Sequence, residues 1–97
     1  MANTYTQLYV HYVFAVQNRA CLLKMQWRDE LYKYITGIVE KQKRKLYIIN
    51  GMDDHLHCLI SMAPTQFPSE LMYHVKRSSS LWINNNKLVR FRFSWQD

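Results

Sequence analysis

The chain is poor in the residues that loosen or cross-link a polypeptide. Its 97 residues include two glycines, two prolines and two cysteines. So little glycine and proline, beside 48% hydrophobic residues, excludes a collagen-like repeat, a flexible linker and a disordered tail. Cys21 and Cys58 are too few for a disulfide scaffold and match no zinc-binding spacing, which is typical of a reducing cytosol.

Signals for membranes and secretion are also missing. No run approaches the ~18 consecutive apolar residues of a membrane span. The first residues contain neither the basic region nor the small-residue cleavage site of a secretory signal. We therefore predict a cytoplasmic protein without membrane contact, and a single domain over residues 1–97, since a chain of this length has room for one core.

Acidic residues are outnumbered by basic ones. Thirteen Lys and Arg residues against seven Asp and Glu residues give a net charge of +6. A basic domain favours polyanionic partners, above all nucleic acids, through electrostatic steering and counterion release. The alternative is a charged surface that only keeps the protein soluble.

The hydrophobic pattern predicts six elements. Alternation with a period of two predicts strands over residues 4–16, 45–50, 55–62 and 89–95. Helical spacing predicts one helix over residues 26–44, with Asp29 and Glu30 in its first turn, and a second from Pro68 to residues 84–86. Asn50-Gly51 is a turn signal between the second and third strands. This order is the α+β, ferredoxin-like (split βαβ) plan, an antiparallel sheet with two helices on one face.

Most aromatic residues fall on apolar stripes of these elements. The core is therefore expected to contain Phe14, Trp27, Trp82 and Phe91. Phe93 and Trp95 lie near a sheet end, where a further segment could equally bury them.

Two histidines are the sharpest feature of the sequence. His55 and His57 are two residues apart in a predicted strand, so both imidazoles lie on one face while Leu56 and Cys58 point to the core. Two imidazoles on a strand can bind a divalent cation if further ligands come from elsewhere. The alternative is a pair of surface histidines that happen to alternate with apolar residues.

Three other residues are candidates for the surroundings of this pair. Asp53 and Asp54 are possible sources of an oxygen ligand, although both could serve only to close the turn. His11 lies on the open face of the first strand, with Tyr9 and Val13, and is a candidate neighbour of the metal site.

These motifs together resemble a known family. The His-hydrophobe-His pattern on a central strand is similar to that of the HUH nucleases, and the whole chain resembles the single-tyrosine transposases of the insertion-sequence 200/605 type. The resemblance is carried by residues 11–16 with Arg19, residues 50–57, Lys76 with residues 78–84, and residues 93–97. Asp53 departs from it, because family members commonly carry proline there, and this predicts a looser turn before His55.

The resemblance implies a reaction and a cofactor. Such transposases cut and rejoin single-stranded DNA at the hairpin-bearing ends of a mobile element, through a tyrosine that forms a 5′-phosphotyrosine intermediate. It gives His55 and His57 the role of ligands to Mg²⁺ or Mn²⁺. In the family the tyrosine and a further metal ligand lie on a helix after the block that ends this sequence, so the tyrosine is expected beyond Asp97. No residue of this chain is therefore assigned as the nucleophile, and the chain is expected to be C-terminally truncated.

The expected partners are single-stranded hairpin DNA and a second copy of the chain. The candidate DNA-binding residues are Arg19, Lys76, Arg77, Arg90 and Arg92. Arg90 and Arg92 would share a face of the last strand, opposite Phe91 and Phe93, and form a phosphate track. The alternative for each cluster is a solvated face. For the basic residues that end the first helix it is complementation of the helix dipole, and we favour it there. Relatives are homodimers joined edge to edge, and the last strand is the expected exposed edge.

Two other functions remain as alternatives. The chain could be a non-catalytic module, truncated or domesticated, that still holds folded DNA ends or inhibits a complete copy by dimerising with it. An RNA-binding module on the RRM-like plan is disfavoured, because the first and third strands lack the expected glycine-and-aromatic sequence.

Overall fold

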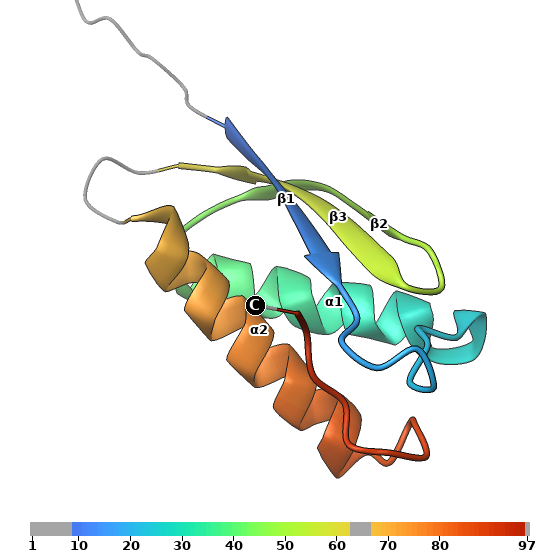
Figure 1. Cartoon of the computed structure of the whole chain (residues 1–97). Coiled ribbons are helices and arrows are strands. Elements are labelled where there is room, and N and C mark those ends of the chain that lie inside the picture. The colour runs from blue at the N-terminus through green and yellow to red at the C-terminus, as the bar shows by residue number, and fades with distance from the viewer. Residues whose placement is uncertain (1–8, 63–66, 97) are drawn as a thin grey trace, which may run out of the picture.

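The computed structural model describes residues 9–62 and 67–96 (Figure 1). Its elements follow the order β1 (Tyr9–Ala15), α1 (Met25–Lys41), β2 (Leu46–Gly51), β3 (His55–Ser61) and α2 (Pro68–Asn85). The predicted start of the first strand, residues 4–8, lies outside the described residues, and so does Asp97, beyond which the nucleophilic tyrosine is expected. Among the described residues, no helix is long and apolar enough to cross a membrane.

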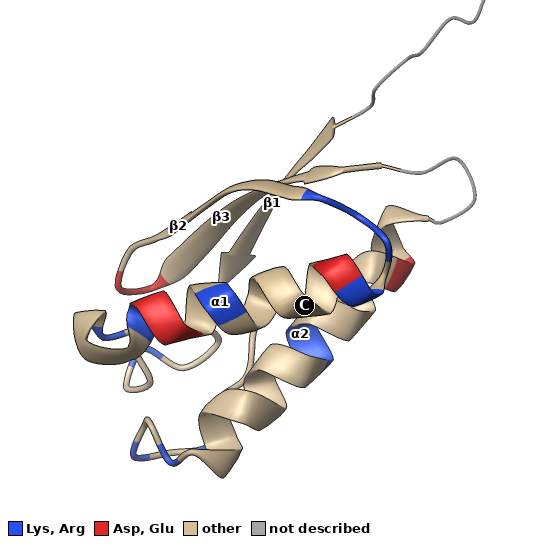
Figure 2. Ribbon diagram, turned by 180° about the vertical axis from the view of Figure 1, so that it is seen from behind, with Lys and Arg blue, Asp and Glu red and all other residues tan. Residues whose placement is uncertain are grey.

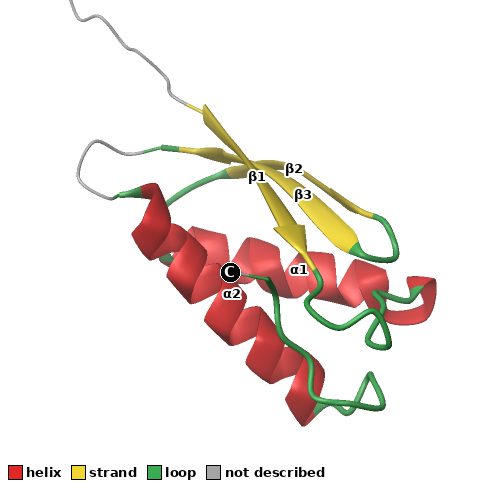
Figure 3. Ribbon diagram, viewed as in Figure 1, coloured by secondary structure: helices red, strands yellow, loops and turns green. Residues whose placement is uncertain are grey.

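The three strands form one antiparallel sheet in the order β1-β3-β2. β3 is the central strand, and both helices lie on the same side of the sheet (Figure 3). The predicted α+β class, with an antiparallel sheet and two helices on one face, is confirmed.

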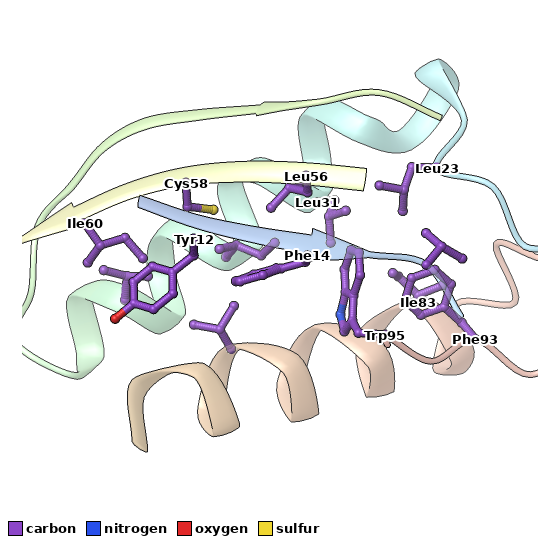
Figure 4. Close-up of a cluster of buried hydrophobic side chains, with 14 of the residues drawn as sticks. Tyr12, Phe14, Leu23, Leu31, Leu56, Cys58, Ile60, Ile83, Phe93 and Trp95 are labelled. Carbon is purple, nitrogen blue, oxygen red and sulfur yellow. The ribbon is translucent and has the colours of Figure 1, made fainter. Parts of the chain in front are cut away.

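The core lies between the sheet and the two helices (Figure 4). Alternate residues of β1 and β3 enter it, because successive side chains of a strand point to opposite faces. The buried strand residues are Tyr12, Phe14, Leu56, Cys58 and Ile60. The helices contribute buried positions at helical spacing, which include Leu31, Ile35, Val39, Leu71, Val75 and Ile83. The opposite face of the sheet is left without a covering element in the described residues.

The first helix is shorter than predicted. It ends at Lys41, not at residue 44, because Lys43 adopts a left-handed conformation (φ 58°) that stops it. It also begins at Met25, and its first turn contains no acidic residue. The placement of Asp29 and Glu30 in that turn was therefore wrong.

Gly51 is the last residue of β2, and the turn follows it over residues 52–54. A Cβ atom at this position would lie 2.9 Å from the hydroxyl of Tyr32 and 3.3 Å from the carbonyl oxygen of His55. The close approach of α1 to the hairpin favours glycine here, since a Cβ atom would have to displace the Tyr32 hydroxyl, and no glycine among the described residues has a positive φ.

The predicted fourth strand over residues 89–95 is wrong. Only one isolated bridge forms among the described residues, between Val16 and Trp95, and residues 88–94 are loop. The side chain of Asn84 explains this, because it accepts the Phe93 N–H at 2.7 Å and donates to the Phe93 carbonyl at 3.0 Å. A strand would need those backbone groups for its ladder. The exposed edge expected along this strand is therefore absent from the described structure.

The loop also changes which aromatic residues are buried. Phe93 and Trp95 are 1% and 6% exposed, whereas Phe91, predicted to lie in the core, is 57% exposed. Trp95 packs edge-on against Phe14, and its indole N–H donates to the buried Ser79 hydroxyl at 2.9 Å. Phe93 and Trp95 are thus buried by the chain itself and need no further segment to cover them.

Candidate functional site

His55 and His57 lie side by side on the open face of the central strand. Both are half-buried, their ring centroids are 4.9 Å apart, and their ring planes stand at 77°. Leu56 and Cys58 alternate with the two histidines along β3. Both point into the core and are fully buried. Burial raises the pKa of the Cys58 thiol to about 12, so this cysteine is a core residue and not a thiolate ligand. The shared face predicted from the alternation is observed.

Each imidazole has its Nδ1 atom engaged by a polar neighbour. His55 Nδ1 lies 2.7 Å from the carboxylate of Asp54. This hydrogen bond holds the pKa of the Asp54 carboxyl below its usual value. His57 Nδ1 lies 3.2 Å from Nε2 of His11. The candidate neighbour on the first strand therefore does adjoin the pair.

The pair offers two imidazole nitrogens, so a divalent cation held here would need further ligands. A neutral imidazole engaged through Nδ1 offers its Nε2 atom, and an orienting partner on the other nitrogen is typical of metal-binding histidines. Among the described residues, no group of three or more His, Cys, Asp or Glu side chains is arranged to hold a metal ion. The carboxylates of Asp53 and Asp54 contact Arg28 and His55, and neither completes such a group.

The turn before His55 is held firmly, although Asp53 stands where proline is common in the family. The guanidinium of Arg28 donates to the Gly51 carbonyl at 3.1 Å and to the Asp53 carboxylate at 3.0 Å. The Asp53 carbonyl accepts the Leu23 N–H at 2.7 Å, and the Asp54 carbonyl accepts the Val16 N–H at 2.9 Å. The expectation of a looser turn is therefore not met. Arg28 was missed from the sequence, because nothing local marks its contact with a turn 25 residues away.

Among the predicted DNA-binding residues, Arg19 lies near His55. The two line an open cavity of about 400 Å³ next to the turn, and the other lining residues are Leu22, Met52, Asp53 and Asp54. Arg19 is exposed and close enough to Asp54 to lower the pKa of that carboxyl further. A phosphate placed at the histidines would therefore lie near a guanidinium.

Arg90 and Arg92 lie on the loop after α2, where both are exposed. They line an open groove of about 440 Å³ together with Phe91 and Lys87. The Cys21 thiol lies 3.6–3.7 Å from the carbonyl oxygens of residues 91 and 92, so this loop packs against the loop that follows β1. The strand on which the two arginines were predicted to share a face is absent. Both side chains are nevertheless exposed and can contact phosphate.

The loops after β1 and α2 bring basic residues to one end of the molecule. The basic residues on these two loops are Arg19, Lys24, Lys87, Arg90 and Arg92. Lys24, Lys87 and Arg90 also line one further small cavity between the loops. Figure 2 shows these basic segments at the end of the molecule that carries the β2–β3 turn, and a second basic stretch at the far end, between α1 and β2.

Lys76 and Arg77 lie apart from this end, on the helix layer. The Lys76 ammonium donates to the carbonyl of Gln96 at 2.8 Å, and Arg77 donates to the Tyr73 hydroxyl at 3.2 Å. Lys76 therefore helps to hold the C-terminal segment against α2. The structure does not bring these two residues together with Arg19, Arg90 or Arg92.

Within residues 9–62 and 67–96, no tyrosine lies beside the histidine pair on the open face formed by β1 and β3. Tyr9, the one tyrosine of β1 on the open face, pairs with Ser61, whereas His57 pairs with Val13. Four residues of strand separate these positions by ~13 Å. Desolvation, and then its hydrogen bond with Tyr47, raise the pKa of Tyr9 above its usual value, which disfavours the phenolate. The others lie in the core, on the helices or on β2; they are Tyr12, Tyr32, Tyr34, Tyr47 and Tyr73.

The resemblance places the nucleophilic tyrosine outside the described residues. These residues end at Gln96, so the structure gives no position for that tyrosine. The assignment of a tyrosine beyond Asp97 therefore stays a prediction from the resemblance.

Comparisons with known proteins agree with this architecture. The model of a family described as "Transposase IS200 like" matches residues 4–97. The chain is also similar to the crystal structure of a protein from Deinococcus radiodurans R1 described as a "putative transposase". The two have 16% sequence identity and a TM-score of 0.79, over 100% of this chain and 83% of that one. A search of curated proteins gave no match.

Proposed function

Because this chain belongs to the family of IS200-like transposases, we propose that it binds single-stranded hairpin DNA at the ends of a mobile element, together with Mg²⁺ or Mn²⁺. The observation that carries the proposal is the pair His55 and His57 on the open face, each with Nδ1 engaged and Nε2 left for a ligand. The DNA would enter from the end of the molecule that holds Arg19, Arg90 and Arg92.

The cation would be held by the two imidazoles and by ligands that the described residues do not supply. When bound, it polarises a phosphate and offsets the charge that develops on a leaving oxygen. Asp54 and His11 orient the two rings, and the buried Leu56 and Cys58 fix the strand between them. Arg19 neutralises a phosphate beside His55.

Strand transfer by this family's chemistry needs a nucleophile within ~3–3.5 Å of the phosphorus. The resemblance places that nucleophile beyond Asp97, so the proposal for the 97-residue chain is limited to DNA and metal binding. A truncated or domesticated module that holds folded DNA ends without catalysis is the alternative form of the proposal. The homodimer expected from the resemblance stays a prediction, which light scattering of the chain in solution tests.

The exposed arginines of the loop give a prediction on DNA binding. Replacing Arg90 and Arg92 by alanine should reduce the slope of log affinity against log salt by up to about 1.4, at ~0.7 per lost phosphate contact on a single strand. Affinity for a hairpin with a single-stranded flank should be measured at several salt concentrations, with random duplex of equal length as competitor. The hairpin is expected to bind more tightly.

The control removes the same charge from the other end of the molecule. Lys41→Ala with Lys43→Ala deletes two exposed cations near the end of α1, far from the β2–β3 turn. This variant should keep the wild-type salt slope. If both double variants reduce the salt slope equally, DNA affinity depends on the net charge alone. The proposed entry of DNA at the loop is then wrong.

The absence of a described tyrosine near the pair gives a prediction on chemistry. The 97-residue chain, incubated with Mg²⁺ and a labelled hairpin end, should give no covalent protein–DNA adduct on a denaturing gel. Appending a tyrosine-bearing amphipathic helix after Asp97 should restore one. An adduct that disappears in Tyr9→Phe would contradict this reading, since Tyr9 is the strand tyrosine that shares the open face.

A further inference from the structure

Three of the four histidines of this chain lie together on the open sheet face, but only two of them are in the paired motif. His11 is on β1, opposite Leu59, and its ring meets that of His57 diagonally across the strand pair. The ring centroids are 5.2 Å apart, the planes differ by 18°, and His11 Nε2 lies 3.2 Å from His57 Nδ1. His11 and His57 share a hollow with Ile48 and Leu59, whose side chains are apolar.

Metal binding at His57 would decide which ring donates this hydrogen bond. If His57 binds a cation through Nε2, that nitrogen carries no proton, so its single proton is on Nδ1 and is donated. His11 Nε2 must then be the acceptor. An accepting Nε2 leaves the proton of the His11 ring on Nδ1.

This arrangement also excludes His11 as a third ligand of the cation. Its Nε2 lone pair is directed to His57, so the same nitrogen cannot bind the cation at that moment. This agrees with the finding that the described residues contain no three-ligand group. His11 and Asp54 therefore have parallel positions, one behind each histidine of the motif.

We infer that His11 is a positioning residue for the metal site, which holds His57 in the tautomer that leaves Nε2 available to a divalent cation. The inference rests on the proposed function, since it concerns the same site. Loss of an outer hydrogen-bond partner of a metal-binding histidine lowers metal affinity by roughly 10- to 100-fold. His11 is exposed, so its substitution should leave the fold intact.

Two variants separate the hydrogen bond from the bulk of the ring. His11→Phe keeps a planar ring but removes the acceptor, and should lower Mn²⁺ affinity about 10-fold. His11→Gln places an amide oxygen at about the distance of Nε2 along the side chain, and should recover most of the lost Mn²⁺ affinity. His74→Phe, at an exposed position of α2, is the control and should leave the affinity unchanged.

The second readout needs no metal. Two-bond ¹⁵N–¹H NMR spectra of the metal-free protein report which nitrogen of each imidazole carries the proton. Wild type, His11→Gln and His74→Phe should show His57 with its proton on Nδ1, and His11→Phe should move that proton toward Nε2. An unchanged His57 tautomer in His11→Phe, or wild-type Mn²⁺ affinity in that variant, overturns the inference while leaving the metal site standing. Failure of the wild-type chain to bind Mn²⁺ overturns both.

Discussion

Replacing Phe93 by alanine is expected to lower the free energy of unfolding by about 3–5 kcal/mol. The side chain is 1% exposed and packs edge-on against Trp95, with ring centroids 4.8 Å apart. Its removal leaves a cavity where the C-terminal segment meets the end of α2, which the clamped backbone cannot close. Because domains of this size are typically stable by only ~5–15 kcal/mol, the variant should be close to unfolding. Urea denaturation followed by circular dichroism measures the change.

The matched control is the same substitution two residues earlier. Phe91 is 57% exposed, so Phe91→Ala should change the unfolding free energy by no more than about 0.5 kcal/mol. Comparable losses from both variants would mean that residues 89–95 form a regular element with both rings covered, and would contradict the loop seen here.

The second large effect is expected at the histidine pair. His55→Ala with His57→Ala should lower Mn²⁺ affinity by at least about 100-fold, since loss of outer partners alone costs roughly 10- to 100-fold and here the ligands themselves are removed. Binding by the wild-type chain should itself be weak, because the described residues supply only two imidazoles and water must complete the shell. Electron paramagnetic resonance of free Mn²⁺ gives both affinities.

The control for this variant is His74→Ala, which removes an exposed imidazole from α2. It should bind Mn²⁺ as the wild type does. Acidification should weaken wild-type binding, because protons compete with the metal for imidazole nitrogen. Equal Mn²⁺ affinity in the double histidine variant and the wild type would show that the metal binds elsewhere and would refute the site.

Local periodicity was enough to predict the regular elements around the site. The alternation in residues 55–62 puts His55 and His57 on one face and Leu56 and Cys58 on the other, because successive strand residues point to opposite sides. The helical spacing of buried residues likewise predicted both helices to within a few residues of their ends. These features follow from each segment's own pattern and need no knowledge of its neighbours.

Other features depend on contacts between distant segments. Alternation also predicted a strand over residues 89–95, but Asn84 takes both backbone groups of Phe93 and turns Phe91 outward. The guanidinium of Arg28 donates a hydrogen bond to the Asp53 carboxylate and so stabilises the turn, although position 53 lacks the rigid proline common in the family. His11 comes to lie against His57 across 46 residues of sequence, because β1 pairs with β3 in one register. A periodic pattern cannot encode such pairings, since their energy depends on which side chains the completed fold brings within hydrogen-bonding distance.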